Sequence, residues 1–145
     1  MKAFITLILC TGLFIITLSS CRHKNLDNHI DLSVNKLYAE KEGLSTTVTG
    51  NNTFSFYLIK EQGDTIYWVN DPSSQEKSEL NGYEFGCNAS YLSGHNMTLD
   101  RPTTKSLKIQ LGPNPYNEKR IITIVVMPNN REYGRMDSLK IIQDY

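Results

Sequence analysis

The sequence predicts an all-β domain, an immunoglobulin-like β-sandwich of about seven strands, preceded by an apolar N-terminal segment. Short runs rich in β-branched and aromatic residues alternate with polar residues, as expected for strands with one buried and one wet face. Turn-forming residues separate these runs at intervals of about 8–15 residues. No stretch after the N-terminal segment shows the sustained 3.6-residue period of an amphipathic helix.

The first half of the domain contains four predicted strands. Two of them flank Glu42-Gly43, and the second of these is rich in β-branched residues. In the third, apolar residues alternate from Phe54 onward, and Gln62-Gly63-Asp64 then predicts a hairpin turn. The four strands are expected at residues 36–39, 44–49, 54–59 and 65–69.

The second half of the chain ends in the clearest strand patterns. Residues 71–82 offer few apolar side chains to bury and predict a loop, followed by a strand at 83–91. Residues 106–111 alternate between polar and apolar and predict a half-buried strand. Residues 121–127 are almost continuously apolar, as in a central strand, and a final strand is expected at 139–142.

The N-terminus has the layout of a secretory signal. Lys2 supplies a positive charge, and residues 3–18 are almost wholly apolar. This apolar run is shorter than the roughly 20 residues that a membrane-spanning helix requires. Leu18-Ser19-Ser20-Cys21 resembles the lipobox of bacterial lipoproteins. We therefore expect a lipoprotein signal peptide over residues 1–20 and lipidation of Cys21.

The lipoprotein resemblance implies a mature chain that begins at Cys21, carries a diacylglyceryl thioether and an N-acyl chain such as palmitate, and is held at the outer membrane. Residues 21–35 are polar and aperiodic, which predicts a flexible tether after the lipidated cysteine. Arg22, His23 and Lys24 follow the cysteine directly. Surface-exported lipoproteins of Bacteroides-like bacteria tend to carry acidic residues there, so the periplasmic face is favoured over the cell surface.

The charge of the chain argues against a nucleic-acid-binding protein, and its cysteine content argues against a domain held together by disulfides. The chain has 15 Lys and Arg against 15 Asp and Glu, and loss of Lys2 with the signal leaves 14 against 15. Nucleic acid selects a strongly basic face, so no nucleic-acid partner is expected. Cys10 leaves with the signal and lipid takes up Cys21, so Cys87 has no partner for an intramolecular disulfide. We expect Cys87 to be a buried structural residue.

Segments at both ends of the domain resemble the BACON domain of Bacteroides-type proteins. Shared features are an alternating strand with an Asn-containing turn, an Arg that opens the next strand, and a last strand ending in Gln. The matching segments are residues 37–39, 42–48, 106–114, 119–126 and 137–143. Residues 70–103 depart from the family pattern. The resemblance implies one BACON-like sandwich over residues 36–145.

The same resemblance implies a membrane-anchored, non-catalytic binding module, with carbohydrate or mucin as the ligand. Two characteristic positions of the BACON-like segments have structural interpretations. Asn114 suits a tight turn because its side chain bonds to local backbone, and Arg120 is expected to lie across a sheet edge and oppose edge-to-edge association. The alternative function, from a different class, is a structural or protein-interaction lipoprotein of the cell envelope.

Aromatic residues on the second predicted hairpin form the candidate ligand site. Tyr57, Tyr67 and Trp68 are expected to present their rings to the C–H faces of a sugar. The alternative is that Trp68, the single tryptophan, anchors the core, as in many sandwiches. Asp64-Thr65-Ile66 resembles the sites of O-glycosylation in exported Bacteroides-type proteins, so Thr65 is a candidate for this modification, and Ser138 is a second candidate.

No set of residues indicates catalysis or metal binding. Cys87 and His95 are of the nucleophile and base types, but no orienting third group accompanies them. The three His residues lack metal-ligand spacing, and no array of Asp and Asn resembles a calcium loop. We expect no enzymatic activity, no cofactor and no metal. The expected partners are the membrane, through the lipid anchor, and a glycan or an envelope protein.

Overall fold

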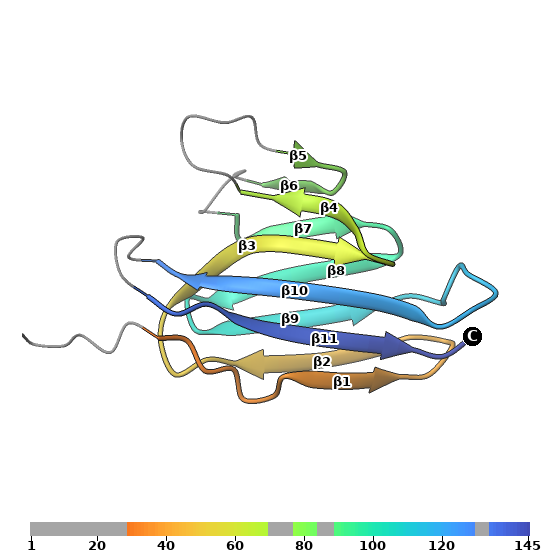
Figure 1. Cartoon of the computed structure of the whole chain (residues 1–145), viewed down its shortest axis with the longest axis horizontal. Helices are drawn as coiled ribbons and strands as arrows, with labels where there is room; N and C mark the ends of the chain where they lie inside the picture. The colour runs from red at the N-terminus through yellow and green to blue at the C-terminus, as the bar shows by residue number, and fades with distance from the viewer. Residues whose placement is uncertain (1–28, 70–76, 84–88, 130–133) are drawn as a thin grey trace, which may run out of the picture.

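Two β-sheets packed face to face form the protein, and no helix occurs in the residues that the structure describes (Figure 1). The computed structural model describes residues 29–69, 77–83, 89–129 and 134–145. The all-β, immunoglobulin-like sandwich predicted from the sequence is thereby confirmed. This part of the chain contains eleven strands, whereas about seven were expected.

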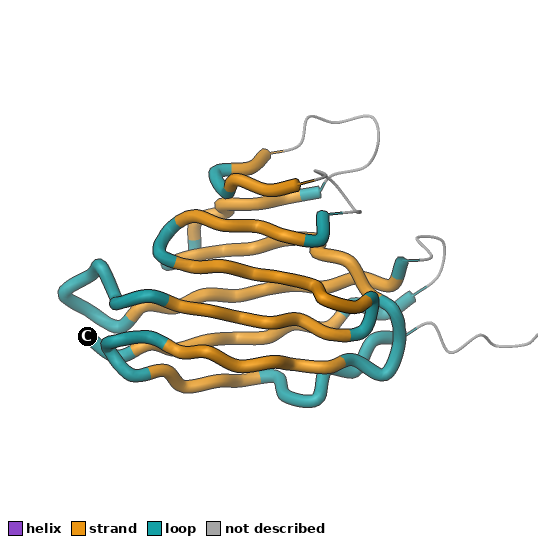
Figure 2. Tube along the Cα trace, turned by 180° about the vertical axis from the view of Figure 1, so that it is seen from behind, coloured by secondary structure: helices purple, strands orange, loops and turns teal. Residues whose placement is uncertain are grey.

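The first sheet has six strands and the second has five. In spatial order the first consists of β1 (Lys36–Ala39), β11 (Asp137–Gln143), β10 (Arg120–Pro128), β3 (Phe54–Glu61), β4 (Asp64–Trp68) and β5 (Lys77–Ser78). The second consists of β2 (Leu44–Thr49), β9 (Ser106–Leu111), β8 (Met97–Thr103), β7 (Tyr91–Gly94) and β6 (Asn81–Tyr83). Only β1 and β11 run parallel among the neighbouring pairs of these strands. Figure 1 looks onto the first sheet, and Figure 2 shows the molecule from behind.

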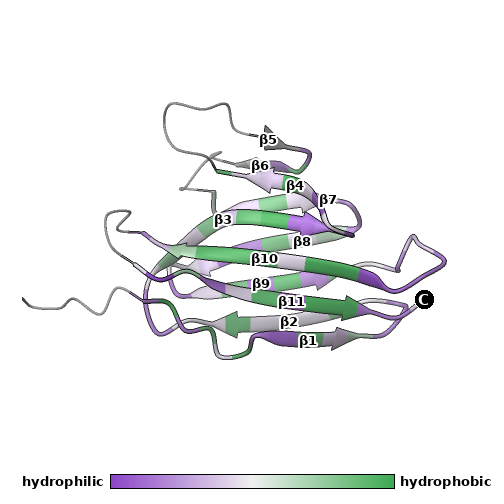
Figure 3. Ribbon diagram, in the orientation of Figure 1, coloured by the Kyte–Doolittle hydropathy of each residue, from purple (hydrophilic) through white to green (hydrophobic). Residues whose placement is uncertain are grey.

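Alternation along the strands sends one set of side chains into the core between the sheets. β9 shows this most clearly, because buried and non-buried residues alternate along its whole length. The largest apolar stretches lie on β3, β10 and β11, the middle of the first sheet (Figure 3). Both sheets contribute fully buried residues to the core, among them Val48, Phe54, Phe56, Ile59, Leu92, Leu99, Leu107, Ile109, Ile122, Ile124, Leu139 and Ile141.

The segment between β4 and β9 differs most from the prediction. Most of the single strand expected at 83–91 lies outside the described residues; of its two ends, Tyr83 is the last residue of β6 and Tyr91 the first of β7. Residues 97–103, for which no strand was expected, form β8. Pro102 lies where the register between β8 and β9 shifts, and such an irregularity tolerates a residue without an N–H.

The sandwich begins earlier than Lys36, the first residue expected after the tether. Ile30 is only 1% exposed and belongs to the core. The N–H of Leu32 donates to a carboxylate oxygen of Asp137 at 2.8 Å, and the N–H of Ser33 donates to the carbonyl of Thr49 at 2.7 Å. Residues 30–33 are therefore joined to both sheets and form part of the folded domain.

Candidate functional site

The outer face of the second sheet carries a row of uncharged polar side chains. Residues directly opposite each other on neighbouring strands share a face of the sheet. The register therefore places five such residues side by side across β2, β9, β8, β7 and β6, namely Ser45, Gln110, Thr98, Ser93 and Asn81. Hydroxyl and amide groups thus cross the whole sheet in one line.

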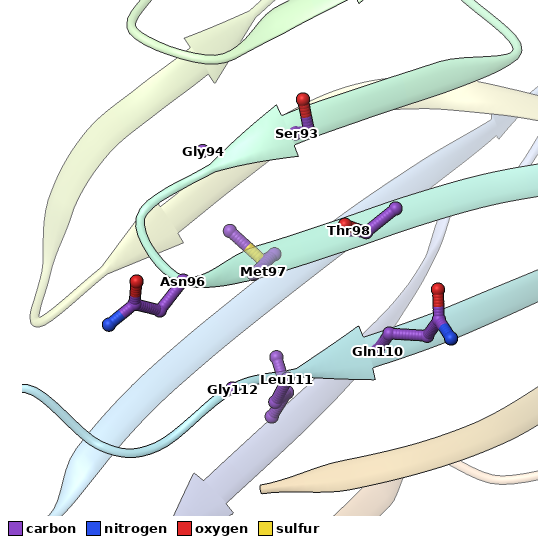
Figure 4. A pocket seen from close by; sticks show the side chains of 8 residues that line it. All are labelled: Ser93, Gly94, Asn96, Met97, Thr98, Gln110, Leu111 and Gly112. Atoms are coloured by element: carbon purple, nitrogen blue, oxygen red, sulfur yellow. The ribbon is translucent and has the colours of Figure 1, made fainter.

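Two open hollows lie on this row. The larger, of about 400 Å³, is lined by Ser93, Gly94, Asn96, Met97, Thr98, Gln110, Leu111 and Gly112 (Figure 4). The smaller, of about 260 Å³, is lined by Asn81, Gly82, Tyr91 and Ser93. Ser93 lines both hollows, so they are neighbours, and we call the pair the polar groove. None of these lining residues carries a formal charge.

A tight hairpin turn shapes one end of the polar groove. Gly94 pairs with Met97, and the two residues between them, His95 and Asn96, both have a φ of 51°, as in a type I′ turn. Gly94 has a φ of 147°, which residues with a side chain rarely adopt. The carbonyl of Asn96 accepts a hydrogen bond from the N–H of Gly112 at 2.8 Å. This bond ties the turn to the end of β9.

A buried ion pair holds the turn from its inner side. Arg120 is fully buried, Glu61 is 3% exposed, and the Nε of Arg120 donates to Oε1 of Glu61 at 2.6 Å. The second carboxylate oxygen of Glu61 lies 2.6 Å from Nδ1 of His95. Arg120 also donates through Nη2 to the backbone carbonyl of His95. Both the side chain and the backbone of His95 are therefore fixed by buried charges.

Gln143 extends this network to the other wall of the groove. Nη1 of Arg120 donates to the side-chain carbonyl of Gln143 at 3.3 Å. The side-chain amide of Gln143 donates to the carbonyls of Gly112 at 2.9 Å and Lys41 at 3.1 Å. The network thus contacts both segments that line the larger hollow. The expectation that Arg120 lies across a sheet edge is wrong, because β10 is an inner strand and the side chain is buried.

Both ring nitrogens of His95 face carboxylates. Nε2 lies 3.6 Å from a carboxylate oxygen of Glu79, on the side opposite to the Glu61 contact. A nucleophile–base pair would instead need a hydroxyl or thiol beside the imidazole, and Cys87, the thiol considered for that role, lies outside the described residues. The geometry around His95 therefore fixes the position of the turn.

Tyr116 borders the same network from the loop before β10. Burial and the neighbouring Glu61 carboxylate raise the pKa of the Tyr116 phenol above its ordinary value, while Arg120 opposes this shift. The hydroxyl therefore keeps its proton over a wider pH range and remains a hydrogen-bond donor beside Glu61. The phenol adds a neutral group at the solvent side of the buried ions.

The chemistry of the polar groove suits an uncharged ligand that is rich in hydroxyl groups. Hydroxyl and amide side chains both donate and accept hydrogen bonds, as sugar hydroxyls do. Tyr91 adds an aromatic ring at the smaller hollow, where apolar C–H groups of a ligand can pack. A charged ligand would find no opposite charge among the lining residues.

The three aromatic residues expected to bind ligand do not form one platform. Tyr67 is a core residue, 2% exposed, with its ring edge-on to Phe56 at a centroid distance of 6.4 Å. Trp68 is 36% exposed, so it is not the core anchor that the alternative proposed. Tyr57 is half-buried, and its carbonyl accepts a hydrogen bond from Val69. All three aromatic residues belong to the first sheet and lie away from the polar groove.

Two other predicted positions can be located, and one lies outside the described residues. Asn114 forms a turn as expected, because its side-chain oxygen accepts a hydrogen bond from the N–H of Tyr116 and its side-chain amide donates to the carbonyl of Glu118, each at 2.9 Å. Thr65 is half-buried in β4, just after the turn, and its modification stays a prediction. Cys21 lies outside the described residues.

The row of polar residues in the groove was not predicted from the sequence. Its members Asn81, Ser93, Thr98 and Gln110 lie on the solvent-facing side of the sheet, where a polar residue is the ordinary choice. A usable signal in the sequence was the absence of charged residues at the solvent-facing positions Ser93, Thr98 and Gln110. That signal acquires meaning only when the register brings the three strands together.

The described part of the chain contains no group of three or more His, Cys, Asp or Glu residues placed to hold a metal ion. Within the same residues, no helix has the length and apolar character needed to cross a bilayer.

Comparison with known proteins shows the fold alone. No protein-family model matches the chain. No curated protein matches it either. Among solved structures, the NMR structure of a protein from Bacteroides thetaiotaomicron is similar, with a TM-score of 0.54 and 20% sequence identity, over 84% of this chain and 92% of that one. The chain therefore shares its β-sandwich fold, over most of its length, with a Bacteroides protein.

Proposed function

We propose that the protein is a lipid-anchored outer-membrane protein whose sandwich is a non-catalytic module that binds an uncharged carbohydrate chain in the polar groove. The row of neutral donors and acceptors across five strands carries this proposal. A sugar chain presents hydroxyls along its length, and neutral partners meet them without the cost of desolvating a charge. The groove is open along the row, as a chain-like ligand requires.

Sequence resemblances support the anchor and the ligand class. The lipobox at residues 18–21 supports acylation of Cys21, with the periplasmic face favoured. The BACON-like segments support a sandwich that binds carbohydrate or mucin. The fold shared with a Bacteroides thetaiotaomicron protein agrees with such an origin. A two- or three-chain anchor would hold the domain at the membrane permanently.

Affinity gel electrophoresis of residues 22–145, in gels that contain neutral polysaccharides or mucin, tests the ligand. We expect retardation by at least one neutral polymer. The variant Thr98→Ala/Gln110→Ala removes two hydrogen-bonding groups from the larger hollow, each contributing about 0.5–1.5 kcal/mol. Its affinity should fall about tenfold or more.

Two controls separate the groove from the rest of the surface. Thr47→Ala lies on β2 outside both hollows and should bind as the wild type does. Trp68→Ala tests the aromatic site expected from the sequence and should also bind normally. Lack of retardation in every neutral polymer, or equal retardation of Thr98→Ala/Gln110→Ala and wild type, would refute carbohydrate binding in the groove.

Mass spectrometry of the chain isolated from its native membrane tests the anchor. We expect acyl chains on the Cys21 residue and loss of residues 1–20, and an unmodified sulfur would refute the anchor. The alternative function, an interaction protein of the envelope, is favoured by apolar side chains exposed on the first sheet, such as Tyr38 and Ile121. A stoichiometric envelope partner whose binding is insensitive to sugars would support it.

A further inference from the structure

The outer face of the first sheet has a composition unlike that of the polar groove. The register places twelve side chains in three rows across β1, β11, β10, β3 and β4. The first row is Tyr38, Ile142 and Ile121; the second is Lys36, Lys140, Thr123, Lys60 and Thr65; the third is Ser138, Val125, Leu58 and Trp68. We call these twelve residues the lysine face.

Apolar side chains flank the lysine row on both sides. Tyr38 is 69% exposed, and Trp68 and Ile121 are each 36% exposed. The other three, Leu58, Val125 and Ile142, are half-buried. The solvent-facing side of an antiparallel sheet is normally polar. Six apolar residues among these twelve positions therefore indicate a binding surface.

The charge of this face is of one sign. Lys36, Lys60 and Lys140 lie in a single row, and none of the twelve residues is Asp or Glu. Asp144, beyond the end of β11, lies 3.6 Å from Lys119 and is paired there. Association of two copies through this face would bring one lysine row against another, which is unfavourable. The complementary surface must therefore be anionic.

We propose that the lysine face docks on an anionic lipid surface. Proteins that lie on a bilayer place Lys side chains among the headgroups, Trp and Tyr rings at the interface and aliphatic groups below them. The rows of this face supply all three kinds of group. Lys36 Nζ lies 4.9 Å from the ring centroid of Tyr38, so a cation and an aromatic ring are presented together. This inference rests on the proposed lipid anchor and assigns a role to a second face.

The length of the tether favours lipid as the partner of this face. Nine peptide units separate Cys21 from Ile30, the first core residue, and they span at most about 30 Å. An anchored domain is thus held near the bilayer, and even a weak contact becomes populated.

Trp68 is the only tryptophan of the chain, so its fluorescence reports on this face. Residues 22–145, which contain the whole described sandwich, are tethered through an N-terminal hexahistidine to vesicles that carry a nickel-chelating lipid. The vesicles consist of phosphatidylcholine with brominated acyl chains, with or without phosphatidylglycerol. We expect strong quenching of Trp68 when phosphatidylglycerol is present, weak quenching in its absence, and a decrease as salt is added.

Charge-neutralising variants test the lysine row directly. Lys36→Gln/Lys60→Gln/Lys140→Gln should lower the affinity of the untethered protein for phosphatidylglycerol vesicles about a hundredfold, since each basic residue contributes roughly fivefold. The matched control is Lys108→Gln, an exposed lysine on the outer face of the second sheet, which should leave the affinity unchanged.

Absence of quenching, equal quenching on neutral and anionic vesicles, or wild-type affinity of the triple variant would each overturn the proposal. A protein partner in place of lipid would leave Trp68 unquenched. The assay depends neither on acylation of Cys21 nor on sugar binding. An unmodified Cys21 therefore refutes the anchor, whereas an unquenched Trp68 in a protein with acylated Cys21 refutes only the docking of this face.

Discussion

The two outer faces of the sandwich carry different chemistries on equivalent frameworks. The outer row of the second sheet holds hydroxyl and amide groups, whereas the outer face of the first sheet holds six apolar side chains and three lysines. Both inner faces are largely apolar and pack into one core. Folding of a sandwich depends on the inner faces, so the outer ones are free to diverge. The contrast agrees with the two separate ligands proposed for these faces.

The faces also differ in how they are held in place. The polar groove depends on a hairpin turn and a strand end, both tied to Arg120 and Glu61 through side-chain bonds. The lysine face extends over β1, β11, β10, β3 and β4, and the backbone ladder of the first sheet sets the positions of its residues. Damage to the buried ions should therefore alter the groove and spare the lysine face.

The largest effect is expected from Arg120→Met. This change leaves the Glu61 carboxylate buried without its partner, and breaking such a pair costs about 3–5 kcal/mol. The free energy of unfolding, measured with urea, should fall by that amount. Binding of neutral polysaccharide should weaken, while lipid binding by the folded fraction should persist.

The double variant Arg120→Met/Glu61→Met keeps this comparison testable if the single variant unfolds. Removing both charges leaves no uncompensated ion, so most of the lost stability should return. Polysaccharide binding should stay weak because His95 has lost both of its anchors. A single variant within about 1 kcal/mol of wild type would contradict the role assigned to the pair.

A smaller effect is expected from Gly82→Ala in the polar groove. A Cβ at this position would lie 2.5 Å from the carbonyl oxygen of Tyr91, so β6 and β7 must separate. We expect a loss of about 1–3 kcal/mol in the free energy of unfolding, with weaker polysaccharide binding. Gly112→Ala is the matched control, because its Cβ would meet nothing closer than 3.5 Å and should change stability by less than about 0.5 kcal/mol.

The smallest effect concerns Tyr116, which borders the ion network. Its pKa is raised above 10.0 in the folded state, so the stabilisation that it gives is present below about pH 10 and is lost as pH rises through the folded pKa. Wild type should therefore lose stability more steeply in this alkaline range than Tyr116→Phe. Urea unfolding at a series of pH values measures the difference, and parallel curves would contradict the shift.

Much of the fold was predictable because strand patterns are local. The limits of β1, β2 and β9 agree with the expected residues 36–39, 44–49 and 106–111. The pairing of β7 with β8 escaped prediction, although the tight turn at His95 and Asn96 lies between the two strands. Pro102 argued against a strand at β8, because proline has no N–H to donate to a neighbouring strand.

The site was less predictable because it depends on contacts between distant residues. Arg120 and Glu61 are 59 residues apart, and nothing in the apolar run after Arg120 indicates a buried carboxylate beside it. Tyr67 and Trp68 are neighbours in the sequence but lie on opposite sides of β4, one in the core and one at the surface. Their pairing as one platform required both to face outward, and the register of β3 and β4 forbids this.

The attachment of residues 30–33 has a mechanical consequence. A pulling force on the proposed acyl anchor would enter the domain at Ile30 and load first the hydrogen bonds of Ile30 to Arg135 and of Asp31 with Asn51. The hydrogen bonds of Leu32 to Asp137 and of Ser33 to Thr49 would follow. Rupture of these hydrogen bonds would release the six residues before β1 and lengthen the tether by about 20 Å. The parallel hydrogen bonds between β1 and β11 would then bear the force in shear. Residues 30–35 would therefore extend before the sandwich unfolds.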